Sequence, residues 1–322
     1  MSSTNWPGTG PSYAPPAEYA GTPARATPTP PSYDDAAVYS STDAGAQAWR
    51  LSFAGLLRSE LRKLTTLAST WVLLGLSLAL GLYSTAQMNA AMLMLVQTLN
   101  DSGATVLPPP TAVSQMLVAA PFYPGAVMGL FGIMAVTNEF GSGMIRTTIA
   151  LAPSRWPALT AKVVVVGAFA FVSAVVGEFI GALIAWPQMS GDAQFDLFTR
   201  LGLQVWLGGS LVVMLLALMG LAFGTLIRST SGAVLTFLLG IMLILPFFAL
   251  LVAAATNSDT VVRHVVTHVP AVAALFVYIG PFLESVGVPN PVMGTADALV
   301  TMLAWTAVPL AGAYAVWVRR DV

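Results

Sequence analysis

The residues best placed to do chemistry lie in a polar segment, 137–162, between two long apolar runs. It carries Glu139, Arg146, Arg155 and Lys162 in a chain in which only 8% of the residues are charged. In a membrane protein, such a segment between two spans could present a rigid element to a soluble partner. An ordinary connecting loop is the alternative interpretation.

Within this segment, the sequence predicts a short helix over 144–151. Gly141, Ser142 and Gly143 permit a sharp turn, and Ser142 would cap the helix. Pro153 would end it, because proline lacks an N–H and clashes with the preceding turn. Ile145 and Ile149 then share one helical face.

The other chemistry-bearing side chains do not form an enzyme motif. Neither lysine, Lys63 nor Lys162, stands in a phosphate-binding loop, because Leu and Val follow them instead of Ser or Thr. The chain has no cysteine, which excludes disulfides and thiolate chemistry. His264 and His268 lack the glutamate of a zinc-protease motif, and a zinc site would need Asp259 or Glu284 to converge on them. We therefore expect no catalytic site, metal, cofactor or nucleic-acid partner for this chain.

Glu178 is the one clear carboxylate inside an apolar span, in VVGEFIGALIAW. It follows Lys162 by 16 residues along the same span, which is roughly 24 Å at 1.5 Å per residue. Intramembrane carboxylates are costly and usually face an interior or an aqueous cavity. Glu178 is thus a candidate pathway or proton-linked residue. The alternative is a packing residue for which Gly177 and Gly181 make room.

The elements that position these residues are apolar helices. Hydrophobic residues make up 56% of the chain, and soluble proteins carry about three times its share of charged residues. Apolar runs long enough to cross a bilayer core of ~30 Å recur after residue 66. The sequence predicts an all-α membrane protein with six transmembrane helices, at 67–87, 117–136, 158–186, 201–227, 233–255 and 298–318.

Three pairs of glycines in these spans have GxxxG spacing, which allows helix backbones to approach closely. The pairs are Gly125/Gly129, Gly177/Gly181 and Gly220/Gly224. Residues 256–296 form an external segment whose apolar piece, 269–279, is too short to cross a bilayer and could be re-entrant or interfacial.

Before the spans come two further segments. Residues 1–48 are rich in Pro, Ser, Thr and Tyr and predict a disordered cytoplasmic tail. Residues 49–66 have the spacing of an amphipathic helix lying in the headgroup layer of the membrane lipid. Glu60 falls on its apolar side, where a bare carboxylate is costly, so we expect an ion pair with Lys63.

The basic residues predict the orientation, because Lys and Arg concentrate on the cytoplasmic side. With the amino terminus inside, only Arg200 and Arg263 of the 13 Lys and Arg residues would lie outside. Both termini are therefore expected in the cytoplasm.

Three segments resemble the permease subunits of bacterial type-2 ABC exporters. They are LRSELRKLTTLASTWVLL at 57–74, EFGSGMIRTTIALAPSRWPALTAK at 139–162, and GLAFGTLIRSTSGAVLTFLLGIMLILP at 220–246. The second is similar to that family's pattern of an acidic residue, a glycine turn, a short helix, Pro-x-Arg and a downstream lysine. The tail at 1–48 has no counterpart in this pattern.

The resemblance implies that 49–322 is a six-helix permease domain in the bacterial cytoplasmic (inner) membrane. Two cytoplasmic ATPase subunits, which would hold ATP and Mg, and a second permease copy or paralogue would complete a drug-efflux exporter working by alternating access. The loop at 137–158 would contain the helix that couples to the ATPase. Its expected contact residues are Glu139, Gly143, Ile145, Arg146, Ile149, Arg155 and Lys162, with Arg228 in a second, smaller contact.

Two other functions remain open. A stand-alone secondary transporter or channel would use Glu178 as its ion-linked group. A non-transporting membrane scaffold would use the tail at 1–48 for docking.

Overall fold

The computed structural model describes residues 52–101, 122–142, 156–185, 198–256, 258, 260, 262–285 and 293–319. Within these ranges the chain is helical and contains no strand. In chain order the helices are α2 (Phe53–Thr66), α3 (Ala68–Asp101), α5 (Phe122–Ser142), α7 (Trp156–Ala185), α8 (Arg200–Ile227), α9 (Thr230–Val234), η3 (Leu235–Ile244), α10 (Leu245–Thr256), η4 (Val262–Val266), α12 (Pro270–Ser285) and α13 (Thr295–Arg319). The tail predicted at 1–48 lies outside the described residues.

Five of the described helical stretches are long and apolar enough to cross a membrane. They are Ala68–Gln87, Trp156–Ile184, Arg200–Ile227, Thr230–Thr256 and Thr295–Arg319. The described part of the chain is therefore all-helical, and its five long apolar helices indicate a multi-pass membrane protein, as the sequence predicts. The helix at the second predicted span, α5, is not among the five, so the count of six remains a prediction.

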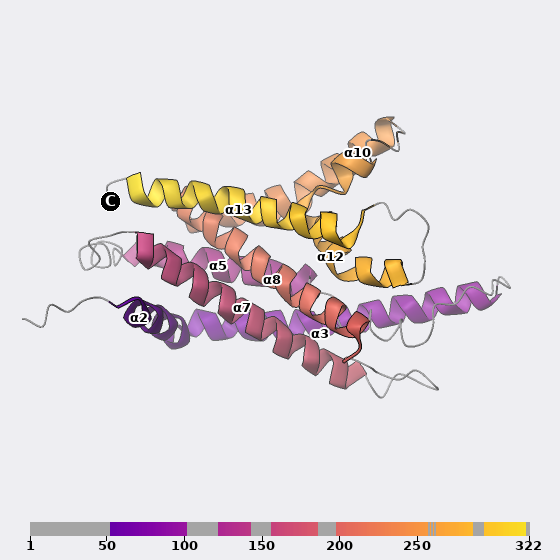
Figure 1. Cartoon of the computed structure of the whole chain (residues 1–322), viewed down its shortest axis with the longest axis horizontal. Helices are drawn as coiled ribbons and strands as arrows, with labels where there is room; N and C mark the ends of the chain where they lie inside the picture. The colour runs from indigo at the N-terminus through magenta and orange to yellow at the C-terminus, as the bar shows by residue number, and fades with distance from the viewer. Residues whose placement is uncertain are drawn as a thin grey trace, which may run out of the picture. The chain divides into compact units, whose positions relative to one another are not determined.

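Helices α5, α8 and α13 run in one direction, and α3 and α7 run in the opposite direction (Figure 1). Contacts at one end of the bundle show this: Phe140 near the end of α5 packs edge-on against Trp317 near the end of α13, and also lies under Arg228 at the end of α8. The amphipathic helix α2 and the start of α7 lie at the same end (Figure 1). We call this the α2 end.

Helix α8 is the central helix of the bundle. Most of its apolar stretch is buried, whereas at most 28% of each of the other apolar stretches is buried. It packs against α5, α7, α12 and α13, and its contact with α5 is the most extensive between any two described helices. The core residues Leu216, Met219 and Phe237, which lie on α8 and η3, are fully buried around this contact.

Glycines explain how closely α5 and α8 approach. A Cβ on Gly132 would collide with the backbone of Ala217, and one on Gly220 would collide with the backbone of Gly129. In a membrane no hydrophobic force drives helices together, so they associate through close packing, and small residues allow their backbones to touch. The prediction of close approach is thus confirmed for two of the three GxxxG pairs. At the third pair, a Cβ on Gly177 would meet only the Leu78 side chain at an ordinary 3.6 Å.

The structure corrects the bounds of the loop predicted at 137–158. Residues 137–142 belong to α5, and Trp156–Ala158 belong to α7, so the connection is 143–155. The helix continues through its polar end because Thr137 and Glu139 are buried against other helices. Ser142 is the last residue of α5, and its hydroxyl donates to the Asn138 carbonyl at 2.8 Å. The short helix predicted over 144–151 lies outside the described residues.

Two other segments differ in detail from the prediction. The fifth apolar stretch is not one regular helix but α9, the wide helix η3 and α10 in succession. In the segment at 256–296, the short apolar piece forms α12, a helix of 16 residues that contains Pro281.

Candidate functional site: a buried charge cluster at the α2 end

Four charged side chains from three helices meet at the α2 end of the bundle. Glu60 and Lys63 come from α2, Glu139 from α5 and Lys162 from α7. The Lys162 ammonium donates to Glu60 Oε2 at 2.6 Å and to Glu139 Oε1 at 2.8 Å. The Lys63 ammonium donates to Glu60 Oε1 at 2.6 Å and to Glu139 Oε1 at 3.0 Å. Each cation thus bridges both carboxylates, and we call this group the charge cluster.

Local sequence places the α2 pair. Ser52 caps α2 by accepting a hydrogen bond from the Gly55 N–H at 3.1 Å, which satisfies one of the helix's free donors. Leu64 follows on the same side and is buried in the core. The chain turns into α3 at Leu67, where the Trp71 indole donates to the Thr65 carbonyl at 2.9 Å. The expected Glu60–Lys63 pair is confirmed, on the buried face of the amphipathic helix.

The other two members come from the helices that flank 143–155. Glu139 lies in the last turn of α5, and Lys162 lies two turns into α7. Lys162 also donates to the Ala135 carbonyl of α5 at 3.2 Å. The ends of α5 and α7 are thereby held together, and both are held to α2.

The cluster is closed to solvent except at Lys63. The exposed fractions of the Lys162, Glu60 and Glu139 side chains are 4%, 5% and 8%, and that of Lys63 is 27%. Two carboxylates and two ammoniums give no net charge, which is the condition for burying charges at acceptable cost.

The environment of α2 shifts two pKa values in directions that keep both groups charged. Burial by itself would raise the pKa of the Glu60 carboxyl, but the charges and hydrogen bonds of Lys162 and Lys63 hold this pKa below its usual value. Burial would likewise lower the pKa of the Lys63 ammonium, but its bonds and attraction to Glu60 and Glu139 raise the pKa above its usual value. Both groups are therefore ionised near neutral pH.

One oxygen of the cluster has no hydrogen-bond partner among the described residues. Glu139 Oε2 is buried, while Oε1 accepts from both lysines. Glu139 stands four residues before the first residue of 143–155.

Arg228 lies near the charge cluster but does not join it. It ends α8 in the left-handed conformation, with φ of 57°, and its N–H donates to the Gly224 carbonyl at 3.0 Å. Its guanidinium carbon lies 5.3 Å from the centre of the Phe140 ring, a distance typical of a cation–π contact. Since Phe140 follows Glu139, the last turn of α5 contacts α2, α7, α8 and α13.

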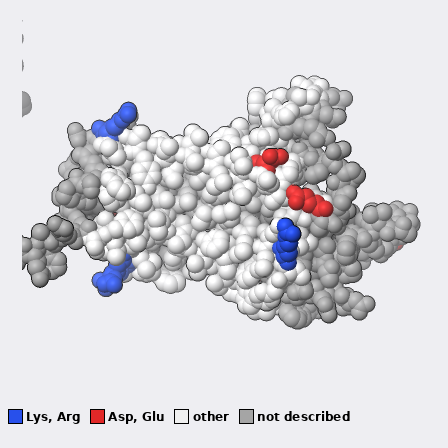
Figure 2. Space-filling model, viewed as in Figure 1, with Lys and Arg blue, Asp and Glu red and all other residues white. Residues whose placement is uncertain are grey.

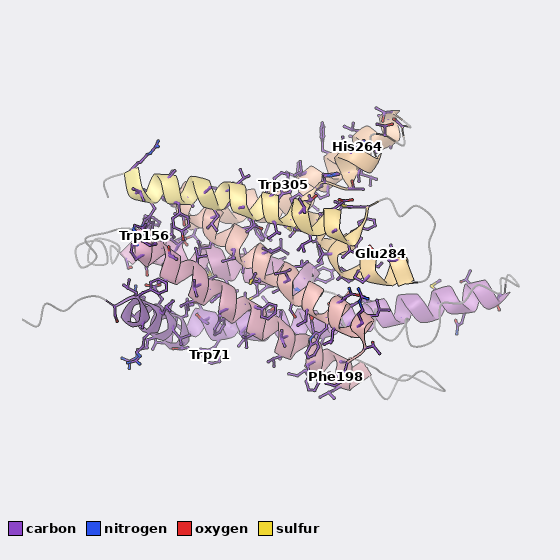
Figure 3. All side chains as sticks on the ribbon, viewed as in Figure 1. Trp71, Trp156, Phe198, His264, Glu284 and Trp305 are labelled. Atoms are coloured by element: carbon purple, nitrogen blue, oxygen red, sulfur yellow. The ribbon has the colours of Figure 1, made fainter. Side chains whose placement is uncertain are left out.

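The two ends of the bundle differ in charge. On the face shown in Figure 2, the charged side chains visible at the α2 end are all Lys or Arg, whereas charged side chains of both signs are visible at the opposite end. The described basic residues at the α2 end are Arg58, Arg62, Lys63, Lys162, Arg228 and Arg319. At the opposite end, Glu284 accepts hydrogen bonds from the Thr295 N–H and hydroxyl, at 3.1 and 2.8 Å (Figure 3).

Glu178 lies apart from the charge cluster, near the other end of α7. Its Oε2 accepts from the Ser210 hydroxyl of α8 at 3.1 Å, and its Oε1 is buried without a partner among the described residues. Glu178 lines a cavity of about 290 Å³ between α3, α7 and the first turn of α5. The Glu178 carboxylate is thus hydrogen-bonded and borders a cavity, and its role as a pathway residue or a packing residue stays a prediction.

The remaining predicted contact residues, Gly143, Ile145, Arg146, Ile149 and Arg155, lie outside the described residues. Their role stays a prediction. Among the described residues, no three potential ligand side chains converge as a metal site would require.

No protein-family model and no curated protein sequence matches this chain. The resemblance to exporter permeases therefore rests on the residues quoted for it.

Sequence reasoning missed two partnerships. It paired Glu60 with Lys63 and did not join them to Glu139 and Lys162. One signal was available in the sequence. Lys63 lies three residues from Glu60, and Lys162, the only other lysine, lies near the start of a predicted span on the side predicted to be cytoplasmic. Ser210 was also missed as the partner of Glu178, because the sequence does not show which residue of α8 faces Glu178 on α7.

Proposed function

We propose that this chain is the membrane-spanning subunit of an ATP-driven exporter. It would pair with a second copy or a paralogue and couple to two cytoplasmic ATPase subunits through 143–155. Movement of that segment would switch the pathway between inward- and outward-facing states. ATP would bind and be hydrolysed in the partner chains only.

The observation that carries this proposal is the charge cluster. A segment that receives force from a motor must pass it to the membrane helices without yielding. Glu139 and Lys162 join the two flanks of 143–155 at 2.8 Å, and both are joined to α2 through Glu60 and Lys63. A displacement of 143–155 would therefore move α2, α5 and α7 as a unit. Such coupling requires the two states to differ in affinity for the partner.

The proposal takes α5 as the sixth span. Its 21 residues reach ~31 Å at 1.5 Å per residue, about the thickness of the hydrocarbon core. It also packs along α8, the most buried of the apolar helices. With six spans, the α2 end would face the cytoplasm, in agreement with its basic side chains.

The absence of cysteine makes a direct test possible. Ser142→Cys places a single thiol on an exposed position at the end of α5. Phe198→Cys is the matched control, because Phe198 is 76% exposed and lies at the opposite end of the bundle to Trp156 (Figure 3). Each full-length variant is expressed in the organism from which the protein comes, so that its natural partners are present. It is then labelled with a photoactivatable maleimide, irradiated in isolated membranes and purified.

We expect Ser142→Cys, and not Phe198→Cys, to capture a subunit that contains a phosphate-binding loop and gives the purified complex ATPase activity. Failure to capture such a subunit from Ser142→Cys would overturn the proposal. Its capture from Phe198→Cys alone would overturn the assignment of 143–155 as the contact.

The second candidate is a stand-alone secondary transporter, and the observation that favours it is Glu178 beside a cavity. Reconstitution of the purified chain in liposomes with an imposed proton gradient distinguishes the two. Gradient-driven movement of a solute without ATP or a second subunit, abolished by Glu178→Gln, would favour the secondary transporter.

A further inference from the structure

The cavity beside Glu178 is almost entirely apolar. Leu74, Leu78, Phe169 and Ile180 provide large parts of its wall. Among its polar lining residues, the Thr85 and Ser173 hydroxyls already donate to the Gly81 and Ala170 carbonyls of their own helices, at 3.0 and 2.8 Å.

Glu178 is the exception in this lining. Among the described residues that line the cavity, it is the only charged one, and its Oε1 is the only buried side-chain nitrogen or oxygen without a hydrogen-bond partner. Ser210 engages the other oxygen and so fixes the direction of the carboxylate. An ionised carboxylate in such a place is costly unless a cation or a proton neutralises it.

The cavity opens through the side of the bundle. Trp71, Val172 and Val176 line it and are 55%, 59% and 50% exposed. They belong to two apolar stretches that are able to cross the membrane, so the opening faces the lipid and not the aqueous ends. A ligand would reach Glu178 from the hydrocarbon layer.

We propose that this cavity binds a small lipophilic organic cation, whose ammonium pairs with Glu178 Oε1 while its apolar body fills the space between α3 and α7. The volume of about 290 Å³ is at the small end of ligand cavities, which limits the ligand to about one aromatic ring with short substituents. An aromatic or alkyl amine enters the bilayer readily. In the cavity, its apolar body would contact the apolar walls and its ammonium would face the negative charge of Glu178. Charge complementarity selects it over a neutral lipid chain.

This inference concerns binding by the chain alone. That such cations are the exported substrates rests on the proposed function. The two can fail separately: cation binding without any captured ATPase would leave the binding site in place and remove the exporter, and the reverse result would remove only the site.

The test compares two ligands of equal shape. The probes are 2-phenylethylamine, which enters the bilayer as its free base and is protonated in water at neutral pH, and its neutral analogue propylbenzene, in which a methyl group replaces the ammonium. Binding to the purified full chain in lipid nanodiscs is measured by titration calorimetry, with empty nanodiscs to subtract partition into lipid. We expect the cation to bind at least about tenfold more tightly than the neutral analogue, because one opposite charge in a low-dielectric site separates them.

Two variants locate the preference. Glu178→Gln keeps the shape of the side chain and should abolish the preference for the cation. Glu284→Gln removes an exposed carboxylate away from the cavity and should leave the preference unchanged. Equal affinity of the native chain for both probes, which needs no variant, would overturn the inference. An undiminished preference in folded Glu178→Gln would also overturn it.

Discussion

Replacing Lys162 with methionine tests whether the charge cluster holds the α2 end together. The substitution keeps an unbranched side chain of similar length and removes only the ammonium. That ammonium donates to Glu60 Oε2, Glu139 Oε1 and the Ala135 carbonyl at 2.6, 2.8 and 3.2 Å. Two buried carboxylates would then share Lys63 alone.

The expected loss of stability is large. The side chain of Lys162 is only 4% exposed, so water could not solvate the two carboxylates in place of the lost ammonium. Removing one partner of a buried ion pair typically costs about 3–5 kcal/mol, because it leaves an uncompensated buried charge. The control is Arg62→Met, which removes an exposed cation from α2 and should cost no more than about 0.5 kcal/mol.

A second substitution should recover part of the loss. In Glu60→Gln/Lys162→Met, the remaining Lys63–Glu139 pair, at 3.0 Å, has no net charge. We expect the double variant to be more stable than the sum of the two single variants predicts, by about 0.5–3 kcal/mol. The measurement is reversible unfolding in mixed micelles, followed by tryptophan fluorescence, for the native chain, Lys162→Met, Glu60→Gln, the double variant and the control Arg62→Met.

The pH dependence should follow the shifted pKa values. The lowered pKa of Glu60 gives stability above its unfolded value, 4.5, which is lost as the pH falls through the lowered pKa. The raised pKa of Lys63 gives stability below its unfolded value, 10.5, which is lost as the pH rises through the raised pKa. The deficit of Lys162→Met should therefore be largest near neutral pH and shrink on acidification, as protons replace the missing cation.

Three results would refute this account of the cluster. One is a Lys162→Met deficit no larger than that of Arg62→Met. Another is strict additivity of Glu60→Gln and Lys162→Met. The third is a deficit that is constant from neutral pH down to about 4.

Further predictions concern helix packing, the α8 turn and the orientation. Gly132→Ala should destabilise the chain by about 1–3 kcal/mol, because its Cβ would meet the α8 backbone, whereas Gly75→Ala has nothing within 4 Å and should not; unfolding in micelles compares them, and equal effects would contradict the close approach. Arg228 has a left-handed backbone, with φ of 57°. Arg228→Gly should be about 1 kcal/mol more stable than Arg228→Ala, because both variants lose the Phe140 contact and only alanine is strained in this conformation. A more stable Arg228→Ala would contradict the left-handed turn. In intact cells, a membrane-impermeant maleimide should label Phe198→Cys and not Ser229→Cys, a substitution at the exposed α8–α9 turn; the reverse labelling would invert the orientation and remove the proposed function.

The sequence alone was sufficient to predict the class of the protein. Long apolar runs can satisfy their backbone groups in a membrane only as helices or closed barrels, and their length predicts helices. The described structure confirms this at five of the predicted spans. The pairing of Glu60 with Lys63 was also predictable, because residues three apart on a helix are neighbours whatever surrounds them.

Only the tertiary structure brought Glu139 and Lys162 to that pair. Lys162 lies 102 residues from Glu60 in the chain, and no periodicity relates positions so far apart. The same holds for the bond between Ser210 and Glu178, which depends on how α7 rotates against α8. Local patterns decide where a helix forms and which face is apolar, but the side chains that meet across helices are set by how the bundle packs as a whole.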